Sequence, residues 1–269
     1  MTPDSTTRAV PITCLRKRYD RLGQTGVSTR ERHNECTQLA REVTPLLDEF
    51  LDAVHDLESY DNRCEGFYPE EGRLDPKARK PDGGTGVVTD RLAAHHPVAV
   101  SKLVLYEFEY MHREVNPLRT TRGKFVDGTP ATPTGKGGID YVALLDGRSP
   151  TPILGEIKVG SDKDAYYAFV QLLTYLSELS SKAQITRANR FLFQGRLVYP
   201  VRFDLHILLW DDNDRGQKGP IIDATCRLAA TFKARLAAAV GASSTLGQVL
   251  CLRDPPGTFA GALDLVWSA

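Results

Sequence analysis

The chain has 269 residues, which is the size of one domain with additions or of two small ones. Hydrophobic residues make up 41% of it and charged residues 25%, and these ordinary globular values exclude a wholly disordered chain. Thirty-four basic residues balance 34 acidic ones, so any binding to a polyanion has to come from local basic patches.

Features that would direct the chain to a membrane or to the cell exterior are missing from the sequence. It contains no apolar run of about 18 residues, and its first twenty residues lack the basic-then-apolar order of a secretory signal. The five cysteines are odd in number and form no C-x-x-C pair. We therefore expect a cytoplasmic protein with reduced thiols and no membrane partner.

The N-terminal part is predicted to be helical. Residues 1–27 show no clear period, but Ser28 to Glu31 has the pattern of a capping box. Apolar residues then recur at helical spacing as far as Leu57, with Pro45 as a potential kink. Residues 61–86 are rich in proline, glycine and charge. These patterns predict an N-terminal helical extension over residues 1–60, a flexible loop or insertion over 61–86, and a main domain over 87–269.

Strands and helices are predicted to alternate in the main domain. A short helix is expected at 87–96 and a longer one at each of 163–181 and 223–240. Strands are expected at 103–110, 139–145, 152–159, 201–210 and 249–252. An order of helix, three strands, helix, strand and helix predicts an α/β fold, with helices packed around a mixed sheet.

Three chemically active residues fall on two neighbouring predicted strands. Asp140 begins one strand, and Glu156 and Lys158 lie on the next. Side chains alternate across a strand, so Glu156 and Lys158 share a face. A glutamate and a lysine inside a short apolar strand cost burial energy, so their presence calls for a functional explanation.

Metal-dependent hydrolysis of a phosphodiester fits these residue types. The carboxylates of Asp140 and Glu156 are hard oxygen ligands of the kind that Mg²⁺ prefers, and the backbone carbonyl of Ile157 is a further candidate ligand. The ammonium of Lys158 could orient the attacking water and stabilise the charge that develops on phosphorus.

These residues resemble a known signature. Asp140 followed by Glu156-Ile157-Lys158 is similar to the D…(D/E)-x-K motif of the PD-(D/E)xK nuclease superfamily. Gln171 and Tyr175, on the predicted helix that follows, match the Q-x-x-x-Y motif of its RecB-like branch. The resemblance extends from about Val87 to Trp210. It implies a restriction-endonuclease-like core with a mixed central β-sheet flanked by helices, cleavage of nucleic acid with Mg²⁺ or Mn²⁺, and supporting roles for Gln171 and Tyr175.

The superfamily often adds a third acidic or histidine group, and several residues compete for that role here. Glu107 and Glu109 lie on a predicted strand, and Glu49 lies on the long N-terminal helix. His95 and His96 end the short helix, where adjacent residues point in different directions. We prefer Glu109, and the number of metal ions stays open.

A basic segment follows the Q-x-x-x-Y helix. From Leu179 to Phe203 there is no aspartate or glutamate, and aromatic residues are interleaved with the basic ones. This composition is typical of a surface that contacts phosphates. The candidate nucleic-acid-binding residues are Lys182, Arg187, Arg190 and Arg196.

The sequence therefore predicts a Mg²⁺-dependent nuclease with DNA as the favoured substrate. DNA repair, restriction and antiphage defence are all open as its setting, and a homodimer or a partner protein docked on the N-terminal helix is an open alternative to a monomer. The competing hypothesis keeps the fold but makes the chain a catalytically inactive subunit that binds nucleic acid or acts as a scaffold.

Overall fold

The computed structural model describes residues 12–61, 84–115, 117, 138–145, 147, 150–160, 164–210, 215–241, 245–255 and 259–269. Its helices are α1 (Cys14–Leu22), α2 (Thr29–Arg41), α3 (Thr44–Asp61), α4 (Thr85–Ala94), α5 (Ala165–Leu179), α6 (Lys182–Phe191) and α7 (Arg215–Val240). Its strands are β1 (Val98–Val100), β2 (Glu107–Val115), β3 (Ile139–Leu145), β4 (Thr151–Val159), β5 (Phe203–Trp210), β6 (Leu246–Arg253) and β7 (Ala262–Ser268). None of the helices in these ranges combines the length and the apolar character needed to cross a membrane.

In the described part of the chain, seven strands form one sheet in which strands adjacent in sequence are also adjacent in space. The sheet closes into a barrel because β1 pairs with β2 on one side and with β7 on the other. The expected restriction-endonuclease-like core, an open mixed sheet flanked by helices, is therefore wrong. The physical reason is the pair of strands β1 and β7, which were not predicted and which together remove both edges of the sheet.

Strand direction in the barrel is mixed. β4, β5 and β6 run parallel to one another, and β1 runs parallel to β7. The other neighbouring strands are antiparallel. The β4 to β5 crossover carries α5 and α6, as a parallel connection requires.

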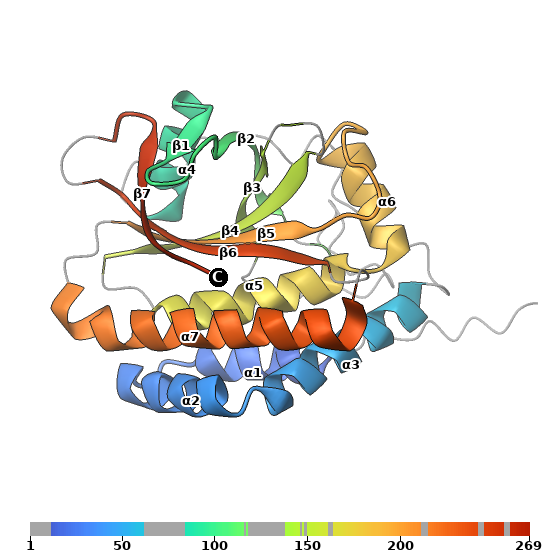
Figure 1. The fold of residues 1–269 in the computed structure, drawn as a ribbon, viewed down its shortest axis with the longest axis vertical. Coiled ribbons are helices and arrows are strands. Elements are labelled where there is room, and N and C mark those ends of the chain that lie inside the picture. Colours follow the sequence, from blue (N-terminus) through green and yellow to red (C-terminus); the bar gives the residue numbers. More distant parts are fainter. Residues whose placement is uncertain are drawn as a thin grey trace, which may run out of the picture.

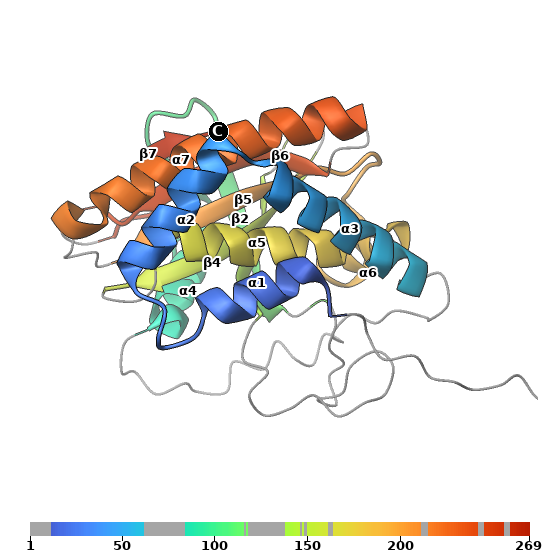
Figure 2. The same ribbon diagram turned by 90° about the horizontal axis from the view of Figure 1, so that it is seen from below.

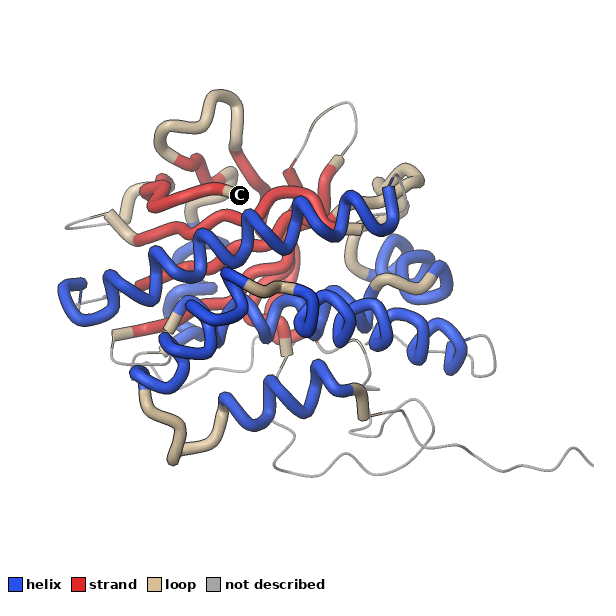
Figure 3. Tube along the Cα trace, turned by 60° about the horizontal axis from the view of Figure 1, so that its bottom comes forward, coloured by secondary structure: helices blue, strands red, loops and turns tan. Residues whose placement is uncertain are grey.

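The helices are distributed unequally around the barrel. Figure 1 shows α5 and α7 lying along one side of the strands, with α1, α2 and α3 forming a further layer outside them. Seen from below, α5 runs between α1 and α7 (Figure 2). Figure 3 shows the same separation of the helical layers from the strands. α4 lies apart from these helices, near β1 (Figure 1), and its Val88 and Leu92 pack into the barrel interior.

The N-terminal helical region is divided more finely than expected. The predicted helix from Ser28 to Leu57 is two helices, because α2 ends at Arg41 and α3 begins at Thr44. Pro45 occupies the first turn of α3, where its missing N–H is not needed, and so it helps to begin a helix rather than to kink one. The capping box at Ser28 and Glu31 is present as predicted. Most of the expected loop, residues 62–83, lies outside the described residues.

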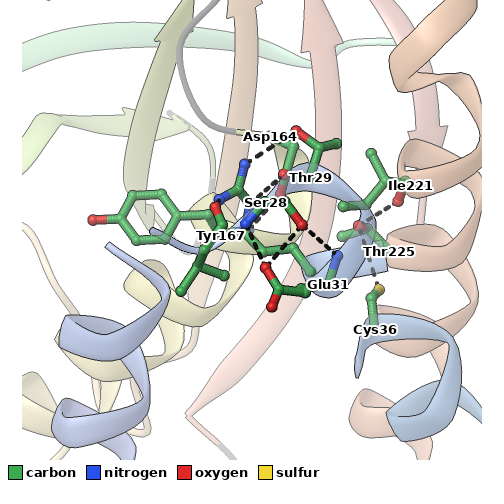
Figure 4. A network of polar contacts seen from close by, with 10 residues as sticks. Ser28, Thr29, Glu31, Cys36, Asp164, Tyr167, Ile221 and Thr225 are labelled. Carbon is green, nitrogen blue, oxygen red and sulfur yellow. Dashed lines mark hydrogen bonds and ion pairs between the residues drawn. The ribbon is translucent and has the colours of Figure 1, made fainter. Parts of the chain in front are cut away.

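A buried ion pair fixes the beginning of α5 against α2. Asp164 caps α5 by accepting a hydrogen bond from the Tyr167 N–H, and its other oxygen accepts one from Arg32 Nε at 2.5 Å. Figure 4 shows this network, in which the start of α2 lies between the first turn of α5 and Thr225 of α7. Arg32 and Asp164 are both buried, so removing either partner would leave an uncompensated charge.

A polar network lies inside the barrel. The Tyr106 hydroxyl donates to Asp204 at 2.8 Å, so the His206 Nε2–H donates to the Tyr106 oxygen, also at 2.8 Å. His206 Nδ1 then accepts from the Tyr141 hydroxyl at 3.0 Å. Burial lowers the pKa of His206 to about 3, so the ring is neutral and keeps this donor–acceptor order. The network joins β3 and β5 to the chain just before β2.

Candidate functional site

The β3–β4 ladder opens where the predicted motif residues lie. The last paired residues are Tyr141 and Gly155. Beyond them the Asp140 carboxylate accepts a hydrogen bond from the backbone N–H of Ile157 at 2.8 Å. This bond takes the place of a backbone partner and holds the Asp140 side chain beside the β4 residues that follow Gly155.

Glu156 presents a buried carboxyl group to this opening. It is 3% exposed, one of its oxygens accepts from Lys158 Nζ at 2.7 Å, and no donor group among the described residues reaches the other. Burial raises the pKa of Glu156 well above its ordinary value, the charge of Asp140 raises it further, and Lys158 opposes both effects. The carboxyl groups of Asp140 and Glu156 therefore lie close together, with the Lys158 ammonium as the positive charge beside them.

Contacts with Glu156, Gln171 and Tyr167 hold the ammonium of Lys158 in place. Besides its bond to Glu156, Nζ lies 3.4 Å from the Gln171 side-chain oxygen and 4.7 Å from the centre of the Tyr167 ring. Lys158 is only 6% exposed, and a charge at that depth is stable only when paired or placed over an aromatic face. Strand alternation put Glu156 and Lys158 on one face as predicted, and this face is the one that α5 covers.

Of the two residues of the Q-x-x-x-Y motif, the structure brings Gln171 into contact with the site and places Tyr175 against α1. Gln171 contacts Lys158, and the Tyr175 ring lies under the guanidinium of Arg16, with 5.4 Å between that group and the ring centre. The sequence pattern placed Gln171 and Tyr175 beside the apolar stripe of the helix, but every residue of α5 is buried. The reason is that α1, α2 and α3 together cover the side of α5 that a two-layer fold would leave in water.

Helix α1 adds residues that the sequence analysis did not identify. Arg16 donates to Glu178 of α5 at 2.5 Å and also lies over the Tyr19 ring. Tyr19 stacks on Tyr167 with 5.4 Å between ring centres. A signal for this helix was available, since Leu15, Tyr19 and Leu22 have helical spacing and are the residues that α1 buries.

Glu109, the preferred third acid, is not brought to this cluster. It pairs with Leu144 across the β2–β3 ladder, four residues along β3 from Asp140, a separation of about 13 Å. Its carboxylate accepts instead from Arg196 at 2.8 Å. Arg196 lies in the loop after α6, so this pair joins that loop to β2.

The other candidates for a third group also lie elsewhere. Glu49 forms an ion pair with Arg18 of α1. His95 ends α4 and packs edge-on against Phe259, 5.3 Å between ring centres. Glu107 is exposed near the far end of β2, where it pairs with β1.

The register of β2 and β3 brings one further acidic position opposite Asp140. Position 114, a glutamate, stands opposite Asp140, because its two neighbours on β2 pair with the two neighbours of Asp140 on β3. Residues opposite each other on paired strands are the closest cross-strand neighbours. The sequence alone could not single out Glu114 from Glu107 and Glu109, since the choice depends on the register.

The residues at the opening fit a divalent cation. Asp140 and Glu156 supply two hard oxygen groups, and the unpartnered oxygen of Glu156 is a costly feature unless a cation or a proton meets it. The Ile157 N–H points to Asp140, and the C=O of the same strand residue points to the same side. Within the described residues there is no group of three His, Cys, Asp or Glu side chains that could hold a metal ion.

The predicted basic residues lie on α6 and the loop after it. Lys182 and Arg190 are exposed, whereas Arg187 is half-buried and donates to Gln184 at 3.1 Å. Arg196 is neutralised by Glu109. Of these four residues, Lys182 and Arg190 therefore carry the exposed positive charge.

Comparison of the chain with family models, with curated proteins and with solved structures gave no match.

Proposed function

We propose that this protein is a metal-dependent nuclease that hydrolyses phosphodiester bonds in DNA. The observation that carries the proposal is the convergence of the Asp140 and Glu156 carboxyl groups beside the buried ammonium of Lys158. Two carboxyl groups this close together, one of them almost completely buried, cost folding free energy unless a proton or a metal cation lies between them. A site that retains such a cost is typical of function rather than of packing.

Asp140 and Glu156 would hold Mg²⁺, or Mn²⁺ in its place, with the Ile157 carbonyl as a further ligand. When bound, such a cation supplies a Lewis acid that polarises a phosphate group and lowers the pKa of a water molecule. The protein itself contributes a rigid arrangement: the Ile157 N–H fixes the orientation of Asp140, and α5 closes the other side of Glu156 to solvent.

Lys158 would stabilise the negative charge that develops on the phosphate oxygens. Its ammonium is fixed before substrate arrives, since Glu156, Gln171 and the Tyr167 ring all contact it, and a preorganised charge needs no rearrangement during the reaction. Gln171 acts through Lys158 and is therefore a positioning residue in this proposal. Tyr175 would brace α5 against α1 through its contact with Arg16.

DNA would approach from the side of α6. Gln184 near the start of α6 donates to the carbonyl of Pro117 at 3.2 Å, and Pro117 follows β2 by two residues. The end of β2 pairs with the beginning of β3, which carries Asp140. Lys182 and Arg190 would contact phosphates directly, and Arg187 and Arg196 would need to leave their present partners to do so.

A second candidate function is a catalytically inactive subunit that binds nucleic acid or serves as a scaffold. The observation that favours it is the small number of acidic groups at the opening: two carboxylates, with no cluster of three ligand-type side chains in the described ranges. The near-complete burial of Glu156 and Lys158 favours it as well.

Cleavage assays separate the two functions. Linear, circular and single-stranded DNA would each be incubated with Mg²⁺, Mn²⁺ or EDTA, using the wild type, Asp140→Asn and Glu156→Gln. Glu58→Gln, the same chemical change at an exposed position of α3, is the matched control. The nuclease proposal expects cleavage that needs the metal and is lost only in the two site variants. Binding without cleavage by any of the proteins supports the inactive subunit.

The proposal also includes association with a second copy or a partner protein through the N-terminal helical region. The exposed outer side of α3 carries Asp48, Asp52 and Asp56, and this surface is where a second copy or a partner protein would dock. Light scattering coupled to size-exclusion chromatography, with and without salt, distinguishes a dimer from a monomer.

A further inference from the structure

The loop between α6 and β5 exposes two large side chains that are adjacent in the sequence. Val198 is 64% exposed and Tyr199 is 48% exposed. Isolated exposed apolar residues are normal on protein surfaces. Here, however, an aliphatic and an aromatic side chain are adjacent, and they lie next to the helix that bears the exposed cations.

This loop is held rigidly. The Asn189 side chain of α6 makes two hydrogen bonds to the backbone of Leu197, accepting from its N–H at 2.9 Å and donating to its C=O at 3.1 Å. Gln194 and Gly195 both have positive φ, and the Gly195 N–H donates to the Asn189 carbonyl at 2.8 Å. Leu197 is buried, so the fold anchors the residue just before the exposed pair.

The Tyr199 ring is also fixed against α6. Its hydroxyl lies 3.0 Å from the Thr186 hydroxyl. Lys182, Thr186 and Arg190 are exposed and spaced four residues apart, so they form one stripe along the helix. The Tyr199 hydroxyl therefore lies beside the helix position midway between Lys182 and Arg190, each of which is about 6 Å away along the helix axis.

We propose that Val198 and Tyr199, together with Lys182 and Arg190, form a stacking platform for a single-stranded segment of nucleic acid. An exposed aromatic ring beside cations suits unpaired bases, because every base has a face that can stack and every linker carries a phosphate. A duplex offers phosphates but keeps its bases inside the stack. The inference rests on the proposed function, since it names the substrate form that the nuclease would prefer.

The platform would deliver a single strand toward the opening at Asp140. The start of α6 contacts Pro117, just beyond the end of β2, which lies beside the beginning of β3. A frayed end or a single-stranded overhang could lie on Tyr199 while the strand continues along α6 toward the end of β2 and Asp140.

Binding measured in EDTA tests this without requiring cleavage. Fluorescence anisotropy with a labelled oligothymidylate and with a labelled duplex would be recorded for the wild type, Tyr199→Ala, Tyr199→Phe and Val198→Ala. Val104→Ala is the matched control, since Val104 is equally apolar and 91% exposed on the β1–β2 turn. Circular dichroism and thermal melting establish that each variant is folded.

Tyr199→Ala is expected to weaken oligothymidylate binding by about 5- to 100-fold, the loss typical of one stacked base. Tyr199→Phe, Val104→Ala and duplex binding should change little. The dependence of affinity on salt adds a second readout. Lys182→Ala or Arg190→Ala should make the plot of log affinity against log salt concentration less steep by about 0.7, as one lost phosphate contact does on a single strand. Tyr199→Ala should leave this slope unchanged.

Unchanged oligothymidylate affinity in Tyr199→Ala would overturn the platform, and so would an equal loss for the duplex. These outcomes leave the nuclease proposal standing if cleavage still requires Asp140 and Glu156. Conversely, a selective loss of single-strand binding in a protein that cleaves nothing would support the platform and reject the nuclease.

Discussion

The Asp140 carboxylate accepts a hydrogen bond from the backbone N–H of Ile157, 2.8 Å away on the neighbouring strand. A side chain thus continues the ladder where the backbone pairing of β3 and β4 has ended. The bond keeps the charge of Asp140 close to Glu156, whose pKa it helps to raise. If Asp140 served only to end the strand, it would not be expected to face the buried carboxyl group of Glu156.

The first prediction concerns metal affinity. Asp140→Asn and Glu156→Gln should each weaken Mn²⁺ binding by at least about 10-fold, since losing even an outer-shell partner of a metal typically costs 10- to 100-fold. Lys158→Ala should weaken it much less, because an ammonium cannot ligate a cation. Isothermal titration calorimetry measures all three. Equal Mn²⁺ affinity in the wild type and all the variants would show that the metal does not bind at Asp140 and Glu156.

Turnover should respond differently from metal affinity. Lys158→Ala is expected to lower the cleavage rate by about 10²- to 10³-fold, the usual loss for one group that stabilises transition-state charge. Gln171→Ala should give a smaller loss, since Gln171 acts only by holding Lys158. Single-turnover cleavage at saturating metal checks this order. A Gln171→Ala protein as inactive as Lys158→Ala would show that Gln171 does more than position it.

The register of β2 leads to a prediction about the third acidic group. Glu114→Gln should weaken metal binding, because position 114 lies opposite Asp140. Glu109→Gln is the comparison on the same strand, and it should leave metal binding unchanged, because the Glu109 carboxylate pairs with Arg196. Calorimetry on the two variants side by side decides between the positions. The reverse result would restore Glu109 as the third ligand.

Glu156 should make stability depend on pH. Its pKa is raised in the folded protein, so between about pH 4.5 and the raised value the folded state binds a proton that the unfolded state has lost. The stability that this group contributes is complete below about pH 4.5 and is lost as the pH rises toward the folded pKa. In EDTA, Glu156→Gln should therefore become progressively more stable relative to the wild type over this range.

Thermal melting at a series of pH values, in EDTA and then with Mg²⁺, measures that difference. Added Mg²⁺ should stabilise the wild type more than Glu156→Gln at neutral pH, because the cation binds only the folded carboxylates. Glu58→Gln is again the control. If the difference in melting temperature between the wild type and Glu156→Gln is the same at every pH, burial does not raise the pKa of Glu156 as predicted.

Gly155 should be intolerant of a side chain. A Cβ there would lie 2.1 Å from the Cε1 and Cζ atoms of Tyr141, whose hydroxyl is bonded to His206 inside the barrel. Gly155→Ala should destabilise the protein by about 1–3 kcal/mol or more. Gly26→Ala, which meets nothing within 4 Å, should be close to neutral. Urea unfolding of both variants measures the difference.

Local patterns were sufficient for much of the site. Alternation along β4 placed Glu156 and Lys158 on one face, and the capping box at Ser28 placed the start of α2. The four-residue spacing of Gln171 and Tyr175 predicted their shared helix face. Such inferences succeed because side-chain direction within a strand or a helix repeats with a fixed period.

Tertiary structure decided the closure of the sheet and the depth of the site. β1 has only three residues, too few for a pattern, yet it pairs with both β2 and β7 and turns an expected open sheet into a barrel. The burial of α5 on all sides depends on α1, α2 and α3, and the apolar stripes of these helices show no partner in the sequence. Strand partners, register and helix packing depend on contacts between residues far apart in the chain, and local periodicity carries no record of them.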